Sequence, residues 1–289
     1  MTVYSHSRLN SFENCPKQFQ FRYVMKIEQE TEGIEAFVGK RVHEVLERLY
    51  EFVDRGQVPP LQKVVDRYYQ LYDKHYDAER IRIVKKGIEP AFYRELGARC
   101  LNNYYRRHYP FDADETLGIE ERVIFELDEL GKYKMQGIID RVARAPDGVI
   151  EIIDYKTGQW VPNQDKIDKD RQLALYQIGL QKVYGPKQPI RLVWHYVAKG
   201  ITRTSERTGE QLESLKRKTI DVIDTIQRET AYEPKKSRLC DWCEYRALCP
   251  LFQDEASSGA TSKSGSSDKS ESPPKPPPLI DRRGQLNLL

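Results

Sequence analysis

Two aspartates and a lysine near the middle of the chain have the types and spacing of a metal-dependent hydrolytic site. Asp140 and Asp154 each follow a run of isoleucines, and Lys156 comes two residues after the second aspartate. Carboxylates that converge beside open space suit Mg²⁺ or Mn²⁺, which prefer oxygen ligands and retain several waters. The alternative is an ordinary Asp–Lys pair on a solvated hairpin. We favour the metal site, because a surface charge pair has little reason to end a hydrophobic strand.

The strands that carry these residues are predicted to form a hairpin. Apolar β-branched runs flank the turn sequence Pro-Asp-Gly at 146–148. With Asp147 at the midpoint of the turn, counting places Asp140 opposite Asp154. Opposed side chains stand about 4.5–5.5 Å apart at Cβ, and like charges placed in this way are destabilising. Lys156 lies on the same strand face as Asp154 and supplies one compensating cation.

The segments around these residues resemble a known nuclease family. Residues 137–141, Gly-Ile-Ile-Asp-Arg, and 152–158, Ile-Ile-Asp-Tyr-Lys-Thr-Gly, are similar to motifs of the PD-(D/E)xK nuclease superfamily and of its RecB-like exonuclease branch. The resemblance covers about residues 4–252. It implies an α/β fold with a restriction-endonuclease-like core, in which a mixed sheet is flanked by helices, together with a helical lobe and an end bound by a cysteine cluster. The implied reaction is metal-dependent hydrolysis of a DNA phosphodiester.

The resemblance also implies roles for single residues. Asp140, Asp154, His43 and the main-chain carbonyl of Tyr155 would hold one or two metal ions, and Lys156 would orient or help to deprotonate the attacking water. On periodicity alone, His43 is a structural histidine beside the apolar stripe of its helix. As a ligand, its imidazole would shift the metal preference towards Mn²⁺.

Two further pairs of polar residues are candidates for the site. Gln172 and Tyr176 lie four residues apart and therefore share one face of a predicted helix. This Gln-x-x-x-Tyr pair resembles the family's nucleic-acid-facing motif, in which the amide and the phenol hold the DNA backbone beside the metals. Glu120 and Glu121 are at the start of a predicted strand and could reach the site, but we favour a solvated strand end for both.

Five cysteines include a group with the spacing of a metal or cluster site. Cys240, Cys243 and Cys249 follow the pattern Cys-x2-Cys-x5-Cys, which leaves three thiolates in need of a fourth ligand. The remaining candidates are Cys15 and Cys100. An odd number of cysteines argues against a secreted disulfide framework.

The N-terminal sequence assigns the fourth cysteine ligand by resemblance. Residues 11–23 resemble the opening of RecB-like nucleases that carry an iron–sulfur cluster. The resemblance places a four-iron, four-sulfur cluster (4Fe-4S) on Cys15, Cys240, Cys243 and Cys249, and leaves the fifth cysteine as a structural residue. The spacing fits zinc as the physical alternative, and a reduced buried trio is a third interpretation.

Apolar periodicity predicts the elements that position these groups. Beside the strand that carries Asp154, the expected helices and strands are helices over 5–25, 36–54, 61–78, 88–109, 169–184 and 209–229, and strands over 116–127, 132–145, 190–197 and 202–207. We expect one nuclease domain over 1–253, with a helical insertion at about 58–112 and a cluster segment at 235–252.

Composition limits the class of protein. The chain has 289 residues, of which 39% are hydrophobic, enough for a sizeable core. No apolar run is long enough to span a membrane, and the N-terminus lacks a signal pattern, so we expect a cytoplasmic protein without a membrane partner. The net charge of +3 is nearly balanced, so a nucleic-acid surface would have to be local.

The last 36 residues, 254–289, change to a composition of Ser, Gly, Lys and Pro that predicts disorder. They end in Gln285, Leu286, Asn287, Leu288 and Leu289, which resemble the short peptides that bind the bacterial sliding clamp, with leucine in place of a final phenylalanine. A frayed tail is the alternative interpretation.

The sequence therefore predicts a metal-dependent DNA nuclease, specifically an exonuclease of DNA repair, recombination or replication. Two alternatives remain open at this point. One is a CRISPR-associated RecB-like nuclease that trims spacer precursors, and the other is a non-catalytic iron–sulfur module that binds DNA.

Overall fold

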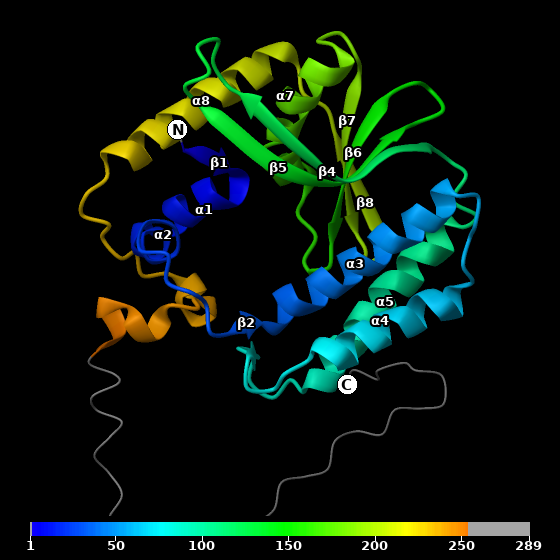
Figure 1. The fold of residues 1–289 in the computed structure, drawn as a ribbon, viewed down its shortest axis with the longest axis horizontal. Coiled ribbons are helices and arrows are strands. Elements are labelled where there is room, and N and C mark those ends of the chain that lie inside the picture. The colour runs from blue at the N-terminus through cyan, green and yellow to red at the C-terminus, as the bar shows by residue number, and fades with distance from the viewer. Residues whose placement is uncertain (1, 254–289) are drawn as a thin grey trace, which may run out of the picture. The chain divides into compact units, whose positions relative to one another are not determined.

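A mixed sheet of six strands forms the centre of residues 2–253, the part of the chain that the structure, a computed structural model, describes. The strands are β1 (Val3–Ser5), β4 (Glu115–Glu126), β5 (Lys134–Arg144), β6 (Ile150–Lys156), β7 (Ile190–Tyr196) and β8 (Ile201–Ser205). Their order is β1-β5-β6-β7-β8, and β4 pairs with β5 (Figure 1). The β1–β5 and β6–β7 pairs are parallel and the others antiparallel. The predicted mixed sheet is confirmed.

The hairpin of β5 and β6 has the register predicted from its turn. Arg144 pairs with Ile150 and Arg141 with Ile153, where the ladder ends. One edge of β5 pairs with β4 along the strand. The opposite edge pairs with β6 near the turn and with β1 at Lys134–Gln136. Asp140 therefore lies where β5 separates from β6, between the part of β5 that pairs with β6 and the part that pairs with β1.

Helices cover both faces of the sheet. One face packs on α3 (Ile34–Asp54), α4 (Leu61–His75) and α5 (Pro90–His108), and the other on α1 (His6–Asn14), α7 (Gln172–Tyr184) and α8 (Gly209–Arg228). Because strand side chains alternate, Ile153 and Val193 face α3–α5, while Ile152 and Leu192 face α7 and α8. The same alternation directs the ring of Tyr155 towards α3–α5.

The N-terminal helix expected over 5–25 is interrupted, so this prediction was wrong. Ser5 caps α1, and its Oγ accepts from the Arg8 N–H. Cys15 is extended, with φ −160° and ψ 109°, and Pro16 begins the short helix α2 (Pro16–Phe19), followed by the π-helix η1 (Gln20–Val24). Proline has no N–H and disfavours a helical residue before it, which accounts for the break.

Short elements complete the fold. They are the parallel pair β2 (Glu32–Gly33) and β3 (Ile81–Arg82), the helix α6 (Gln164–Ile167) and the 3-10 turns η2 (Arg238–Trp242), η3 (Arg246–Leu248) and η4 (Pro250–Phe252). Helix α6 lies between the strand that carries Asp154 and the helix predicted over 169–184, in a segment for which no helix was predicted. The clamp-binding sequence at 285–289 lies outside the described residues, so that interaction stays a prediction.

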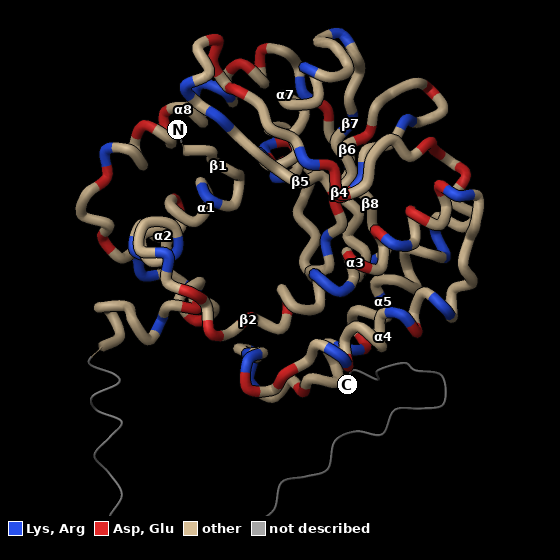
Figure 2. Tube along the Cα trace, viewed as in Figure 1, with Lys and Arg blue, Asp and Glu red and all other residues tan. Residues whose placement is uncertain are grey.

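Charge is mixed over the described elements. Figure 2 shows Lys and Arg interspersed with Asp and Glu along most of the trace. None of the helices in residues 2–253 has the length and apolar character needed to cross a membrane. Because the charges are interspersed, any attraction for nucleic acid must come from local groups.

Candidate active site

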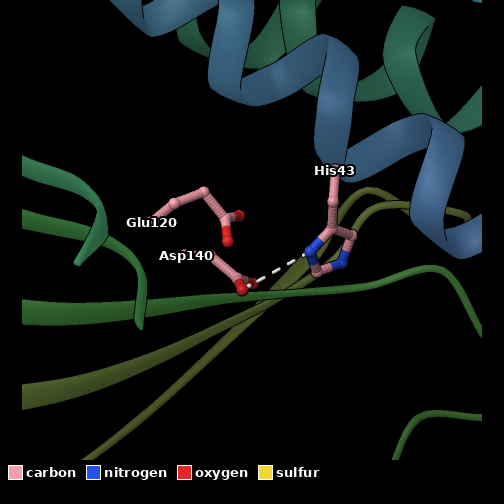
Figure 3. A group of neighbouring side chains, drawn as sticks. All are labelled: His43, Glu120 and Asp140. Carbon is pink, nitrogen blue, oxygen red and sulfur yellow. Dashed lines mark ion pairs between the residues drawn. The ribbon is translucent and has the colours of Figure 1, made fainter. Parts of the chain in front are cut away.

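Three side chains from different elements converge beside the gap in the sheet. His43 of α3, Glu120 of β4 and Asp140 of β5 each place a potential ligand atom within 4.8 Å of the other two. His43 Nδ1 lies 3.4 Å from Asp140 Oδ1, and Figure 3 shows the imidazole beside the two carboxylates. One nitrogen and two carboxylates form a donor set that suits Mg²⁺ or Mn²⁺.

The main chain of Tyr155 joins this group. Its N–H donates to Asp140 Oδ2 over 2.7 Å, and its carbonyl accepts from His43 Nε2 over 2.8 Å. The N–H is available because the β5–β6 ladder has already ended. Neighbouring ligands of an octahedral ion with bonds of about 2.1 Å lie about 3.0 Å apart. His43 Nε2 and the Tyr155 carbonyl oxygen are at about this separation, whereas Asp140 faces the other ring nitrogen, Nδ1.

Asp154 lies beside this group and is held by Lys156 and Gln172. Lys156 Nζ is 3.0 Å from Asp154 Oδ1 and 2.8 Å from Oδ2. Gln172 donates to the same Oδ1 over 3.1 Å and accepts from Lys156 over 3.1 Å. Asp154 Oδ2 is buried, and the Lys156 ammonium pairs with it. Asp154 is outside the group of three, and a metal ion that binds this oxygen would share it with the ammonium or displace the ammonium.

Two glycines allow α7 to lie close to the sheet beside this pair. A Cβ on Gly137 would lie 2.1 Å from Tyr176 Cε1, and a Cβ on Gly179 would lie 2.8 Å from Phe125 Cδ1. The Tyr176 ring therefore contacts the main chain of β5 directly. Gln172, one turn earlier on α7, then reaches Asp154 and Lys156, a positioning contact that the sequence motif did not predict.

The charged groups of the site influence one another strongly. Burial lowers the pKa of His43, but the hydrogen bond and charge of Asp140 and the charge of Asp154 outweigh it and raise this pKa to about 9. Burial raises the pKa of Asp154 against the effect of Lys156. Burial also lowers the pKa of Lys156, but the Asp154 carboxylate outweighs it and raises this pKa. A metal that binds the His43 imidazole must therefore displace a proton.

Glu120 reaches the site through an irregularity in β4. The β4–β5 register shifts between Thr116 and Gly118, and Glu120 has a φ of 48°, in the left-handed region that non-glycine residues rarely adopt. Bulges next to active sites redirect side chains in this way. The preference for a solvated strand end was therefore wrong for Glu120, whereas Glu121 is exposed.

Four of the five cysteines line one cavity between the N-terminal segment and the C-terminal turns. They are Cys15, Cys240, Cys243 and Cys249. The Lys235 N–H donates to Cys15 Sγ over 3.4 Å, and the Ser237 N–H donates to Cys240 Sγ over 3.3 Å. No three cysteine sulfurs of the described residues lie within 4.8 Å of one another. Cys100 is fully buried in α5 and does not line this cavity.

Among known proteins, one family model spans the whole site. No curated protein matches the chain. A solved structure described as "Crystal structure of SSO0001" is similar over 85% of this chain and 95% of its own, with 17% identity and a TM-score of 0.34, which does not establish a shared fold. The model of the "PD-(D/E)XK nuclease superfamily" matches residues 3–250, which include every site residue described above. The chain belongs to the PD-(D/E)XK nuclease superfamily.

Proposed function

We propose that the protein is a metal-dependent deoxyribonuclease of the RecB-like branch that acts as an exonuclease. The observation that carries the proposal is the convergence of His43, Glu120 and Asp140 beside the Asp154–Lys156 pair. Membership of the superfamily supports phosphodiester hydrolysis. The resemblance of the motifs to the RecB-like branch supports the choice of DNA and of exonuclease action.

The residues present fit a divalent cation. His43, Glu120, Asp140 and the Tyr155 carbonyl would hold it, together with the buried Oδ2 of Asp154, which pairs with the Lys156 ammonium. When bound, such an ion lowers the pKa of a coordinated water and offsets negative charge on the phosphate.

Lys156 and Gln172 would position the reacting groups. The Lys156 side chain is 35% exposed, so its ammonium reaches solvent while it contacts Asp154. An ammonium has three donors and no acceptor, which suits orienting a water or stabilising charge on a phosphate oxygen. Gln172 bonds both members of the pair and fixes their relative position.

Cleavage of end-blocked DNA tests this function. We expect the full-length protein to release short products from single- or double-stranded DNA in Mn²⁺ or Mg²⁺, and only from an unblocked end. Asp154→Ala and Lys156→Ala should each reduce the rate by about 10³-fold or more. Asp165→Ala, on the exposed surface of α6, is the matched control and should cleave normally. Cleavage by either site variant at the wild-type rate would remove the assignment, and an inactive wild type would favour the non-catalytic alternative.

We also propose that Cys15, Cys240, Cys243 and Cys249 hold a 4Fe-4S cluster. Their shared cavity and the N–H donors to two of the sulfurs support a site for thiolates. Tetrahedral zinc with Zn–S bonds of about 2.3 Å needs sulfurs about 3.8 Å apart, and no three cysteine sulfurs of residues 2–253 lie within 4.8 Å of one another. The resemblance of residues 11–23 to the opening of cluster-bearing RecB-like nucleases supports the choice of the cluster over zinc.

A further inference from the structure

A cavity of about 460 Å³ adjoins the proposed active site on the side of α1 and has no part in the proposed metal binding. It lies among the start of α1, the strands β4 and β5, and α7. Its polar lining residues are Ser5, His6, Ser7, Arg122 and Gln136, together with Gln172 and Tyr176 of α7. Because Gln172 also bonds Asp154 and Lys156, the cavity is continuous with the groups proposed to act on the substrate.

A cation and two hydroxyls face this cavity without an acidic partner. Arg122 is exposed on β4 and donates to Gln136 over 3.1 Å, and no carboxylate of residues 2–253 pairs with it. The Ser5 and Ser7 hydroxyls lie 2.9 Å apart at the start of α1, whose first turn contains no acidic residue. A helix start carries partial positive charge that favours an anion. These groups together provide an environment for a negative ligand.

His6 adds a neutral polar group to the same wall. Its Nδ1 is buried and has no hydrogen-bond partner among the described residues. Burial, and then the positive charge of Arg171, lower the pKa of His6 to about 4. The imidazole is therefore uncharged at neutral pH, and the positive character of the cavity comes from Arg122 and the helix start.

A second cavity beside the site contains several acidic side chains. It has a volume of about 340 Å³, its charged or titratable lining residues are Lys40, His43, Glu44, Glu47 and Glu120, and it therefore includes two of the proposed metal ligands. Burial, and then the neighbouring carboxylates, raise the pKa of Glu47, as expected where negative charges crowd together. Each nucleotide of a nucleic-acid strand brings one negative charge. Without a metal ion, these carboxylates repel a phosphate, whereas Arg122 and the start of α1 attract one.

We propose that the cavity of Ser5, Ser7 and Arg122 binds a non-scissile backbone phosphate of the nucleic-acid strand, next to the phosphate that is hydrolysed. This site rests on the proposed nuclease function and deepens it. It places part of the substrate strand on the side of α1. The serine hydroxyls and the guanidinium donate to phosphate oxygens, which are the usual partners of such groups.

Binding of a labelled strand without cleavage tests this site. The full-length protein is titrated against a fluorescent oligothymidylate of about 15 nucleotides, in EDTA and at several KCl concentrations. We expect Arg122→Gln to weaken binding about tenfold and to reduce the slope of log Kd against log [KCl] by about 0.7, the value for one phosphate contact on a single strand.

A charge reversal at Ser7 provides the second variant. Ser7→Asp should also weaken binding about tenfold, because it places a like charge against the phosphate. Aspartate in the first turn favours a helix, so the Tm should not fall, and lost binding would not be due to unfolding. Arg217→Gln, on the exposed surface of α8, changes the net charge equally outside the cavity and serves as the control.

The results separate this site from the proposed function. If both variants bind with the same affinity and salt slope as Arg217→Gln, the phosphate site is overturned. If the variants lose binding as expected but the wild type cleaves no DNA in Mn²⁺, the phosphate site stands and the nuclease function fails. A wild type that does not bind the strand overturns the phosphate site, and cleavage in Mn²⁺ then tests the nuclease function separately.

Discussion

Glu120 brings a carboxylate to the proposed metal site at a cost in backbone conformation. Its φ of 48° and the register shift before it are both uncommon in a strand. Such a residue costs on the order of 1–3 kcal/mol and persists where the surrounding structure requires it. Burial, and then the charge of Asp140, raise the pKa of Glu120, so its ionised form is also unfavourable. Both costs are accounted for if the carboxylate binds a cation.

Glu120→Gln separates charge from size at this position. We expect the Mn²⁺ concentration for half-maximal cleavage to rise about 10- to 100-fold, in the range found when supporting groups of metal sites are removed. In EDTA, the free energy of unfolding should not fall, because the variant removes repulsion from Asp140. The neighbouring Glu121→Gln is the matched control, since that side chain is exposed. An equal metal requirement in both variants would show that Glu120 does not bind the cation.

Among the elements, α5 contacts β7 through the half-buried imidazole of His108 and the buried imidazole of His195. The His108 and His195 rings lie 4.8 Å apart, and His108 stacks on Tyr104 at 4.3 Å. Burial, and then the positive charges of Arg141 and Arg107, lower the pKa of His108 to about 4. Burial lowers the pKa of His195 as well. Both imidazoles are therefore neutral when the protein is folded at neutral pH.

This contact should make the fold sensitive to acid. Unfolded histidine has a pKa near 6.5, so between about pH 6.5 and pH 4 the unfolded chain binds more protons, and stability is lost as the pH falls. We expect the free energy of unfolding in EDTA to be lower at pH 5 than at pH 7.5, with about 1–2 kcal/mol of the difference due to His108. His108→Phe should reduce the difference in the free energy of unfolding between pH 5 and pH 7.5. His75→Phe, at the exposed end of α4, should leave this difference unchanged. An equal reduction of this difference in both variants would show that His108 is not the source of the acid sensitivity.

Local signals were enough to predict the longer helices and strands between residues 34 and 229 and the hairpin register. The Pro-Asp-Gly turn and strict alternation determine which residues of β5 and β6 are opposed, and Lys156 follows on the face of Asp154. The position of Glu120 was not predictable, because no local signal marks the shift in β4 or the positive φ. The contact of Gln172 with Asp154 requires two glycines and an aromatic pair from distant segments to meet. By contrast, Pro16 did signal the break in the first helix.

At the scale of the whole molecule, the C-terminal turns attach to the N-terminal segment. Glu244 forms an ion pair with Arg22 and accepts from Gln18 over 3.1 Å. The Tyr245 hydroxyl donates to the Ile27 carbonyl over 3.0 Å. Cys15 and Cys240 are about 225 residues apart, and closing a loop of this length with a covalent link contributes about 5 kcal/mol in a chain-entropy model. A cluster on these cysteines would therefore contribute to the stability of the entire domain.

Serine variants of two cysteines separate the cluster from ordinary packing. Anaerobically purified wild type should be brown and contain iron. Cys15→Ser should lose the colour and the iron, lower the free energy of unfolding by several kcal/mol and make residues 235–252 sensitive to protease. Cys100→Ser places a hydroxyl in the core and should cost about 1–3 kcal/mol, but it should keep the iron, because Cys100 does not line the cavity.

The metal content decides between the two candidate groups at this site. Stoichiometric zinc without iron in the anaerobic wild type would assign zinc and would require the cysteine sulfurs to move closer together than they lie here. Iron lost equally from both serine variants would show that the cluster depends on general stability rather than on Cys15. Iron lost only from Cys15→Ser, with the Glu244 and Tyr245 contacts unchanged, would show that the thiolates hold the cluster and that the cluster in turn joins the two ends of the domain.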